Sequence, residues 1–299
     1  MNDEVEFKAG FVSIIGCPNV GKSTLLNKAI GQKVAIVSDK PQTTRSNIRG
    51  VLSEDGFQII FIDTPGLQKP RNKLGEYMAR ETLQASDRVD AIVLVIDGTR
   101  PLGPRDKNVL SDLASVKTPV IVAVNKADVV DREQMAALLA SLIEFDFVAH
   151  ILPVSALRGT NVDVLINILK DYLKPGPQYF PDDMITDQPE RVLVAEFIRE
   201  KALQLLLEEV PHGIGVEIQQ MKERERDGLV EIFATIYCER ANHKAIIIGK
   251  HGSLLKRIGE LARADIEFLL DARVYLNLWV KVQEGWRNSD SFIRELGYR

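Results

Sequence analysis

Eight consecutive residues near the N-terminus have the types and spacing of a loop that binds phosphate. They run from Gly16 to Ser23 in the order Gly-Cys-Pro-Asn-Val-Gly-Lys-Ser. In such a loop the glycines let the backbone approach phosphate oxygens, the lysine reaches the outer phosphates, and the serine oxygen binds Mg²⁺. The apolar residues 11–15 predict a strand before the loop, and residues 24–30 predict a helix after it. Because loop N–H groups and a helix N-terminus then face the anion, the sequence predicts a nucleoside triphosphate with Mg²⁺.

A second motif indicates which base is bound. The β-branched run 120–124 predicts a buried strand, which ends at Asn125-Lys126-Ala127-Asp128. A carboxylate at Asp128 can accept hydrogen bonds from N1–H and the exocyclic amine of guanine, and adenine does not offer this pair of donors. Asn125 and Lys126 are expected to brace the loop and cover the base, and Ser155–Leu157 predicts a third turn that contacts it. The predicted nucleotide-binding residues are Gly16, Cys17, Pro18, Asn19, Val20, Gly21, Lys22, Ser23, Thr24, Asp63, Thr64, Pro65, Gly66, Leu67, Asn125, Lys126, Ala127, Asp128, Ser155, Ala156 and Leu157.

Between these motifs the chain carries residues that can sense the γ-phosphate. The predicted strand 58–62 leads into Asp63-Thr64-Pro65-Gly66, where Asp63 is suited to the Mg²⁺ shell and the Gly66 N–H to the γ-phosphate. The polar loop Asp39 to Ser46 contains Thr43 and Thr44, one of which is expected to bind Mg²⁺. We favour Thr44, beside Arg45, although the sequence leaves both open. The predicted metal ligands are Ser23, Thr44 and Asp63, and the predicted catalytic residues are Lys22, Thr44 and Gly66.

These motifs, in this order and spacing, resemble a translation-factor-class GTPase of the Era type over essentially the whole chain. The resemblance is carried by the segments Gln42-Thr43-Thr44-Arg45 and Asp63-Thr64-Pro65-Gly66-Leu67, and by the C-terminal half described below. It implies a bacterial GTPase that binds the 3′ end of small-subunit (16S) ribosomal RNA and acts in 30S subunit maturation. It also implies a cytoplasmic monomer, with peripheral association with the inner membrane as a further expectation.

One position departs from the Ras-like pattern. Leu67 stands where Ras-type enzymes place the glutamine that orients the attacking water, and a leucine cannot hydrogen-bond that water. Slow hydrolysis by the isolated protein is therefore expected. Asn19 matches the asparagine that related GTPases use to bind K⁺ near the β- and γ-phosphates, while an asparagine can equally stabilise the turn.

The composition limits the remaining function classes. A formal charge of −4 over 299 residues argues against general polyanion binding, so RNA contacts must be local. Cys17 and Cys238 have no metal-ligand spacing, and a disulfide at Cys17 would obstruct the phosphate loop, so a reducing cytosol is expected. The four histidines are read as surface or packing residues. The N-terminus has no secretory pattern, and no apolar run reaches the roughly 20 residues that span a bilayer.

The order of apolar runs predicts two domains and a linker. Strands separated by helices predict an α/β P-loop GTPase domain over 1–174, with a mostly parallel sheet and helices on both faces. Arg49–Ser53 is expected to add an antiparallel strand. Prolines and aspartates over 175–190 predict a linker that buries little. The expected strands lie near 11–15, 58–62, 91–96, 119–124 and 151–154, and the expected helices include Asp106–Val116, Arg132–Phe145 and Val162–Leu173.

The remaining residues, 191–299, predict an α+β type II KH domain with a C-terminal tail. The pattern is helix, two strands, two helices joined by the turn Gly249-Lys250-His251-Gly252, and a strand, an order that resembles a type II KH domain. In that fold a Gly-x-x-Gly turn lets the chain approach a single-stranded nucleic-acid backbone closely, beside an apolar groove for four bases. Trp279 and Trp286 are expected to pack rather than stack on bases. The predicted RNA-binding residues are Ile248, Gly249, Lys250, His251, Gly252, Lys244, Lys256 and Arg257.

Two other functions stay open at this stage. The first alternative is a signalling or membrane-associated GTPase whose C-terminal module docks proteins. The second is a P-loop nucleotide kinase, but the guanine-selective segment Asn125–Asp128 and the absence of a lid-like arginine cluster count against it.

Overall fold

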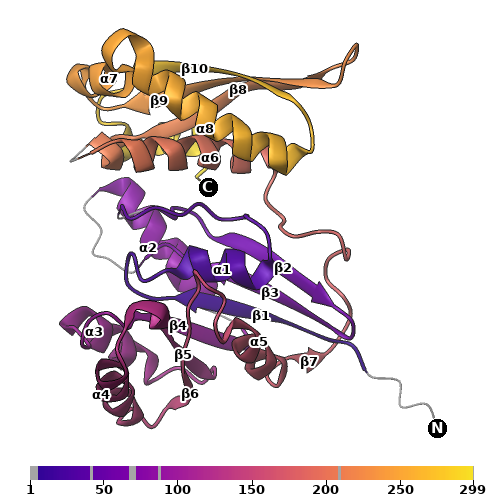
Figure 1. Ribbon diagram of the computed structural model, residues 1–299, viewed down its shortest axis with the longest axis vertical. Helices are drawn as coiled ribbons and strands as arrows, with labels where there is room; N and C mark the ends of the chain where they lie inside the picture. Colours follow the sequence, from indigo (N-terminus) through magenta and orange to yellow (C-terminus); the bar gives the residue numbers. More distant parts are fainter. Residues whose placement is uncertain (1–5, 41–42, 67–71, 87–88, 208–209, 299) are drawn as a thin grey trace. The chain divides into compact units, whose positions relative to one another are not determined.

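The computed structural model describes residues 6–40, 43–66, 72–86, 89–207 and 210–298. The chain forms two compact units (Figure 1). The first contains most residues up to Asp187, and the second contains Gln188–Arg299 with the short segments Ile36–Thr43 and Pro70–Tyr77. The expected boundaries 1–174, 175–190 and 191–299 stay a prediction about which parts fold independently.

The first unit is built on one mixed sheet with the order β2-β3-β1-β4-β5-β6, and β7 pairs with β1. Neighbouring strands are parallel except that β2 is antiparallel to β3, as expected for Arg49–Ser53, and β7 is antiparallel to β1. The central strands are β-branched and buried on both faces, which is typical of a parallel sheet covered by helices. The strands are β1 (Lys8–Ile15), β2 (Ile48–Glu54), β3 (Phe57–Asp63), β4 (Ala91–Asp97), β5 (Val120–Asn125), β6 (Val148–Pro153) and β7 (Lys174–Pro175).

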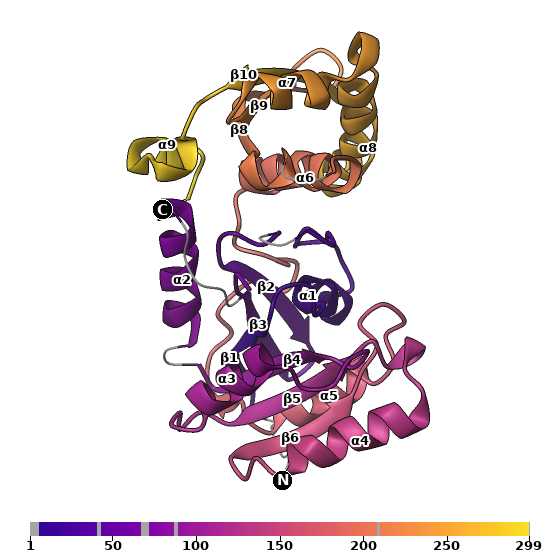
Figure 2. The ribbon, with the colours of Figure 1, turned by 90° about the vertical axis from the view of Figure 1, so that its left-hand side faces the viewer.

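Helices cover both faces of this sheet, which confirms the predicted α/β class. Figure 2 shows α1 on one side of β1–β3 and α3 on the other. Between the helices and the sheet lies a core of aliphatic side chains that are fully excluded from solvent, such as Val12, Leu26 and Val122. The helices are α1 (Lys22–Ile30), α2 (Lys73–Ser86), α3 (Pro104–Leu113), the 3₁₀ turn η1 (Ala127–Val129), α4 (Arg132–Ile143) and α5 (Val162–Lys170).

The segment after α5 lies along the first unit as far as Asp187. None of residues 175–187 is fully buried, in agreement with the expectation that this stretch buries little, but hydrogen bonds hold it against the sheet. Lys174–Pro175 forms the short strand β7 on β1. The buried amide of Gln58 accepts hydrogen bonds from the N–H groups of Tyr179 and Phe180, at 2.9 and 3.0 Å, and donates one to the Phe180 carbonyl. Thr186 forms an isolated β-bridge with Gly50. These bonds satisfy backbone groups that proline-rich sequence leaves outside regular elements.

The second unit has the predicted helix-strand-strand-helix-helix-strand order. Its sheet has the order β10-β9-β8, in which β8 and β9 are antiparallel and β9 and β10 are parallel. The apolar run before Gly249 is the end of a helix, α7. The elements are α6 (Glu190–Leu205), η2 (Val210–Gly213), β8 (Gly215–Arg224), β9 (Leu229–Cys238), α7 (Ala241–Ile248), η3 (Lys250–Gly252), α8 (Ser253–Leu270), β10 (Val274–Val282), η4 (Trp286–Asn288) and α9 (Asp290–Glu295).

The two faces of this small sheet are covered differently. Helices α6 and α8 pack on one face over a core that includes Ile232, Ala234 and Ile236, and α9 lies on the other side (Figure 2). On that side the ring of Phe292 meets Tyr237 edge-on, with centroids 4.8 Å apart. Trp286 is fully buried and donates from Nε1 to the Gly213 carbonyl, so it is a packing residue as predicted.

Among the described residues no helix is long and apolar enough to cross a membrane. The same part of the chain contains no group of three or more His, Cys, Asp or Glu side chains suited to a metal ion. Cys17 and Cys238 are buried and free, in agreement with the expectation of no disulfide.

Candidate functional site

The phosphate loop joins the end of β1 to α1 and depends on three left-handed residues. Gly16, Asn19 and Gly21 have φ angles of 150°, 65° and 98°. A Cβ atom on Gly16 would lie 2.4 Å from the Val95 carbonyl, so no larger residue fits there. Asparagine tolerates positive φ better than most residues, so Asn19 is suited to this position of the turn. This observation leaves its proposed contact with K⁺ untested.

Four predicted side chains meet beneath the loop. Lys22 is buried and donates from Nζ to the carbonyls of Gly16 and Cys17, each at 3.2 Å. The Ser23 hydroxyl donates to Asp63 Oδ2 at 2.6 Å and lies 3.0 Å from the Thr44 hydroxyl. Burial raises the pKa of the Asp63 carboxyl, while Lys22 and the two hydroxyl groups act in the opposite direction. Burial likewise lowers the pKa of Lys22.

This cluster fits a divalent cation. The other carboxylate oxygen of Asp63, Oδ1, is buried and has no hydrogen-bond partner. A buried, unpaired carboxylate oxygen is costly unless a ligand satisfies it. The hydroxyls of Ser23 and Thr44 lie at the neighbouring oxygen Oδ2 of the same carboxylate, and hard oxygen donors of this kind are the ligands that Mg²⁺ prefers.

The structure separates the two threonines that the sequence left open. Thr44 is buried, and its hydroxyl lies 3.3 Å from Asp63 Oδ2. The Thr43 hydroxyl instead donates to the Lys40 carbonyl at 2.6 Å. The geometry therefore brings Thr44, the residue we favoured, to the candidate cation site.

The segment after Asp63 is fixed against the phosphate loop. The Thr64 hydroxyl donates to the Ile14 carbonyl at 2.9 Å, and a Cβ on Gly66 would lie 3.1 Å from Pro18. The Gly66 backbone is therefore close to the loop, as a γ-phosphate contact requires. The predicted residue Leu67 and the switch residue Gln42 lie outside the described residues.

One side chain joins the phosphate loop to the loops that read the base. Asn125 donates from Nδ2 to the Val20 carbonyl at 2.8 Å and accepts from the Ala156 N–H at 2.9 Å. Gly21 has no side chain at the contact, where a Cβ would lie 2.2 Å from Asn125 Nδ2. The predicted bracing role of Asn125 thus has a definite geometry that spans three motifs.

The base-reading carboxylate is held by the third motif. Asp128 Oδ1 accepts a 2.7 Å hydrogen bond from the Ser155 hydroxyl, which lowers the pKa of this exposed carboxyl. The Ser155 hydroxyl also accepts from the Arg158 N–H. The carboxylate therefore faces solvent, ionised and oriented. Leu157, at 71% exposure, lies at the open rim of the same turn.

Two acidic residues beside the site were missed in the sequence. Asp97 ends β4 and accepts from Lys126 Nζ at 2.7 Å. Burial opposes ionisation of Asp97, but hydrogen bonds from Lys126 and Thr99 outweigh it and lower its pKa. Asp97 is paired in register with Asn125, so its place at the carboxyl edge of the parallel sheet was a usable signal.

The other missed residue, Asp106, has only the signal of a helix start, since it is the third residue of α3 after Pro104. It is buried at the start of α3, where it accepts from Arg100 at 2.6 Å and from the Gly103 N–H. Burial and the nearby Asp106 carboxylate raise the pKa of the Cys17 thiol to about 11. The cysteine of the phosphate loop is therefore a neutral packing group at neutral pH.

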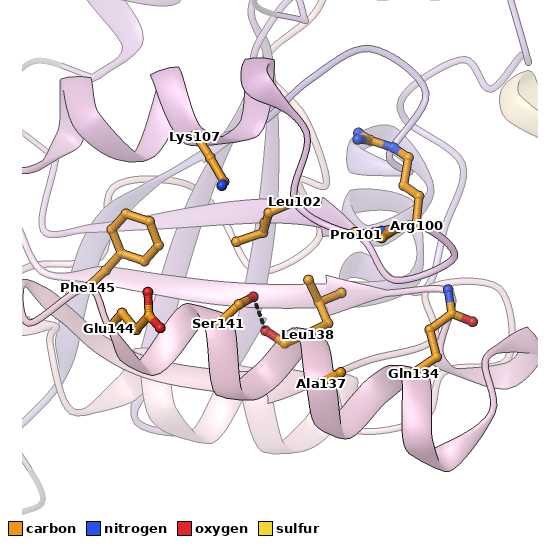
Figure 3. A pocket seen from close by; sticks show the side chains of 10 residues that line it. All are labelled: Arg100, Pro101, Leu102, Lys107, Gln134, Ala137, Leu138, Ser141, Glu144 and Phe145. Carbon is orange, nitrogen blue, oxygen red and sulfur yellow. Dashed lines mark hydrogen bonds between the residues drawn. The ribbon is translucent and has the colours of Figure 1, made fainter.

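A separate cavity of about 470 Å³ lies between α3 and α4 in the first unit. Figure 3 shows Leu102, Leu138 and Phe145 around it, with Lys107 pointing in from α3. None of the predicted nucleotide-binding residues lines this cavity, so we do not assign it to the nucleotide site.

In the second unit, the Gly-x-x-Gly turn has the backbone that its glycines predict. Gly249 and Gly252 have φ angles of 72° and 77°, and His251 is also left-handed. A Cβ on Gly249 would lie 2.8 Å from that of Leu254, whereas Gly252 faces open space. Lys250 and His251 are exposed at the tip of this turn.

A groove of about 520 Å³ runs from this turn between α8 and β10. Gly252 and Lys256 are the predicted RNA-binding residues that line it. Arg257 lies on the same helix and forms an ion pair with Glu260 at 3.4 Å, while Ile248 and Lys244 are half-buried in α7. The remaining lining residues, none of which was predicted to bind RNA, are Leu255, Gly259, Glu260, Arg263, Tyr275, Leu276, Asn277 and Leu278.

The fold and these two sites define a P-loop GTPase joined to a KH domain. Two family models match the chain in agreement with this class. One is described as a 50S ribosome-binding GTPase and matches residues 11–126, and the other as a KH domain and matches residues 209–287.

Similar proteins narrow the class to one family. The chain is 52% identical over 293 residues to GTPase Era of Clostridioides difficile, covering 98% of this chain and 99% of that one. It is 51% identical to GTPase Era of Ruminiclostridium cellulolyticum over 99% of both chains. A crystal structure of Era with MgGDPNP and nucleotides 1506–1542 of 16S ribosomal RNA superposes with a TM-score of 0.94, at 41% identity over 98% of this chain and 99% of that chain. The chain belongs to the Era family of GTPases.

Proposed function

We propose that this chain is a switch that hydrolyses GTP to GDP and phosphate, binds 16S ribosomal RNA near its 3′ end, and acts in assembly of the 30S subunit. The observation that carries the proposal is the presence in one chain of a guanine-selective phosphate site and a groove beside a Gly-x-x-Gly turn. The relative crystallised with MgGDPNP and 16S ribosomal RNA supports this pairing of ligands.

In the nucleotide site each side chain has a separate task. Lys22 places a positive charge where the outer phosphates bind, and Ser23, Thr44 and Asp63 are arranged to hold Mg²⁺. Bound Mg²⁺ neutralises charge on the β- and γ-phosphates. The N–H of Gly66 can contact the γ-phosphate and so report whether it is present.

Positioning of the attacking water is left to backbone groups, to an ion or to a partner, because the leucine at position 67 cannot hydrogen-bond water. We therefore propose a slow intrinsic rate, and K⁺ held by Asn19 as one source of acceleration.

In the second unit the proposed RNA site joins close backbone approach to local positive charge. Gly252 leaves open space at the turn, and Lys250, Lys256 and Arg263 project from the turn and α8. Because single-stranded bases bind in such grooves while the turn holds the sugar-phosphate backbone, an unpaired rRNA segment suits this surface.

We propose that the protein acts as a monomer in the cytoplasm and on the cytoplasmic face of the membrane.

The experiment that tests the switch compares RNA affinity in two nucleotide states. Fluorescence polarisation with RNA from the 1506–1542 segment is measured with GDP and with a non-hydrolysable GTP analogue. Coupling of this kind is typically ~1–3 kcal/mol, or roughly 5- to 150-fold in affinity. Equal affinities in the two states would contradict the switch.

A double variant tests where the RNA binds. Replacing Lys250 and His251 by Asp should weaken RNA binding, because the new carboxylates repel the RNA backbone, and should leave GTP affinity unchanged without RNA. Arg294→Asp, an exposed charge reversal on α9, is the matched control. Binding of proteins but not RNA at this turn would favour the alternative of a protein-docking GTPase.

A further inference from the structure

Three aromatic side chains form a row on the face of the small sheet opposite α6 and α8. Phe233 lies on β9, and Tyr275 and Trp279 lie on the neighbouring strand β10. The rings of Phe233 and Trp279 are stacked at 5.8 Å with 21° between their planes. Tyr275 meets Phe233 edge-on at 6.3 Å from the other side. We call these three residues the aromatic row.

The aromatic row is open to solvent although large rings are usually buried. Tyr275 is 49% exposed and Trp279 is 43% exposed. The other end of the same sheet face is covered by Phe292 of α9, which packs on Tyr237. The tail thus covers one half of this face and leaves the aromatic half uncovered by any described segment of this unit. Trp279 packs on Phe233 as predicted, but it is also 43% exposed.

The aromatic row continues from the groove assigned to RNA. Tyr275 lines that groove and also contacts Phe233 on the sheet face. It can connect the two because β10 is the edge strand of the sheet, so no further strand separates the groove from the face. A chain leaving the groove at Tyr275 therefore reaches Phe233 and then Trp279 without crossing another element.

The charges on this face favour an anionic ligand. Of its two acidic residues, Glu231 pairs with Arg224 at 3.6 Å and lies opposite Lys222 across the strands. Glu217 keeps its charge, but it accepts from the Tyr237 hydroxyl at 2.8 Å, at the end of the face that α9 covers. Lys222 and Lys281 are exposed on the same face, and no described carboxylate forms an ion pair with either. Positive charge beside exposed rings is the combination that binds single-stranded nucleic acid without base pairing.

We propose that single-stranded RNA extends beyond the groove, passes over the edge of β10, and stacks unpaired bases on Phe233 and Trp279. This inference rests on the proposed function, because it requires the groove to hold RNA. It adds a second contact of a different kind: the groove clamps backbone and base edges, and the aromatic row binds the flat faces of the following bases.

The test compares short and long RNAs. RNAs of about four nucleotides, tiled across the 1506–1542 segment, identify the sequence that fills the groove, and extension on either side to about ten nucleotides provides the long probe. Trp279→Ala should weaken binding of the long RNA about tenfold and leave the short RNA unchanged, while Trp279→Phe should restore most of the loss. Phe268→Ala, which removes a ring that is 79% exposed on α8, is the matched control and should change neither.

Intrinsic fluorescence gives a second readout, because the chain has only two tryptophans and Trp286 is fully buried. The long RNA should quench wild-type emission more than the short RNA, and the difference should disappear in Trp279→Phe. If wild type binds both RNAs and Trp279→Ala binds the long one equally well, the aromatic row is not an RNA site and is left to a protein partner. If wild type binds neither RNA, the proposed function itself fails.

Discussion

Guanine selection depends on a carboxylate that is itself held in place. One carboxylate oxygen of Asp128 accepts a hydrogen bond from Ser155, which is fully buried. Asn125 links the turn that contains Ser155 to the phosphate loop by hydrogen bonds to both. The base-reading group and the phosphate-binding backbone are therefore parts of one hydrogen-bonded unit. A change in any of these residues should be felt at both ends of the nucleotide.

Asp128→Asn should move nucleotide preference from GTP to xanthosine triphosphate. The amide donates where the carboxylate accepted, and xanthine carries an acceptor oxygen at C2 where guanine carries an amine. A mismatched polar contact that the bound base covers costs about 1–3 kcal/mol or more, so GTP affinity should fall at least ~5-fold. Titration calorimetry with both nucleotides measures this, with Asp146→Asn as an exposed control in the same unit. Unchanged GTP affinity in Asp128→Asn would mean that another group reads the base.

Asn19 is the residue proposed to hold K⁺ and so to accelerate GTP hydrolysis. If its side chain helps to hold K⁺ beside the β- and γ-phosphates, hydrolysis in K⁺ should be ~10-fold or more faster than in Na⁺ at equal ionic strength, since a fixed cation stabilises developing charge. Asn19→Asp should alter that ratio, whereas Lys22→Ala should abolish nucleotide binding. Phosphate release assays in the two salts measure the effect. Equal rates would remove the ion from the mechanism.

The site residues that could be predicted from the sequence are those whose position follows from the motif itself. Lys22, Ser23 and Asp63 could be placed because Asp63 ends β3, and Lys22 and Ser23 begin α1 after the loop that follows the neighbouring parallel strand β1. Thr44 could be named only by its position in the loop between the two motifs. Asp106 follows Pro104 at the third position of α3, which the sequence could have identified as a helix-capping position, but its contact with Arg100 depends on how the loop before α3 folds.

The regular elements of both units were predictable because their apolar patterns are strong. Each expected strand is present, with β2 antiparallel as predicted, and only the ends differ by a few residues. The segment 176–187 was different. Its prolines exclude a helix. Nothing in its composition, however, shows that the side chain of Gln58 on β3 forms hydrogen bonds with the backbone of residues 179 and 180.

Gln58 should therefore stabilise the segment after α5. Gln58→Leu keeps the size of the side chain but leaves the N–H groups of Tyr179 and Phe180 without an acceptor, and we expect a loss of ~1–3 kcal/mol in the free energy of unfolding. Chemical denaturation measures the loss, and limited proteolysis should cut within 176–187 sooner. Ser53→Ala removes only the hydrogen bond that Gln58 Nε2 donates to the Ser53 hydroxyl and should cost less. Equal effects of the two variants would show that the segment does not depend on Gln58.

For the whole molecule, the charge balance restricts how RNA can be held. The chain carries 38 basic and 42 acidic residues, so attraction to a polyanion must come from a few local cations. Around the groove these are Lys250, Lys256 and Arg263, since Arg257 shares its charge with Glu260. Shape and base contacts must supply the rest of the affinity.

RNA binding should consequently depend only moderately on salt. Each phosphate neutralised on a single strand contributes about −0.7 to the slope of log K against log salt concentration, so three contacts predict a slope of about −2. Lys256→Ala should make the slope less steep by about 0.7. Fluorescence polarisation across a salt series gives the value, with Arg294→Ala as the control. A slope several times steeper would indicate a much larger basic surface than the groove provides.

The way residues 174–187 lie along the first unit has a mechanical consequence. Their attachments are separate and small: the two-residue strand β7, the contact of Gln58 with residues 179–180, and a group of contacts with β2. In that last group Ile185 accepts from the Val51 N–H, Thr186 donates to the Arg49 carbonyl, and Asp187 pairs with Arg49. A pulling force applied beyond Asp187 would load the contacts with β2 first, then the Gln58 contact, and β7 last. The segment would therefore detach from the first unit in several steps, each at a low force, instead of in one step at a high force. Such a segment behaves as a graded tether, whose free length grows by up to roughly 3.5 Å for each residue released.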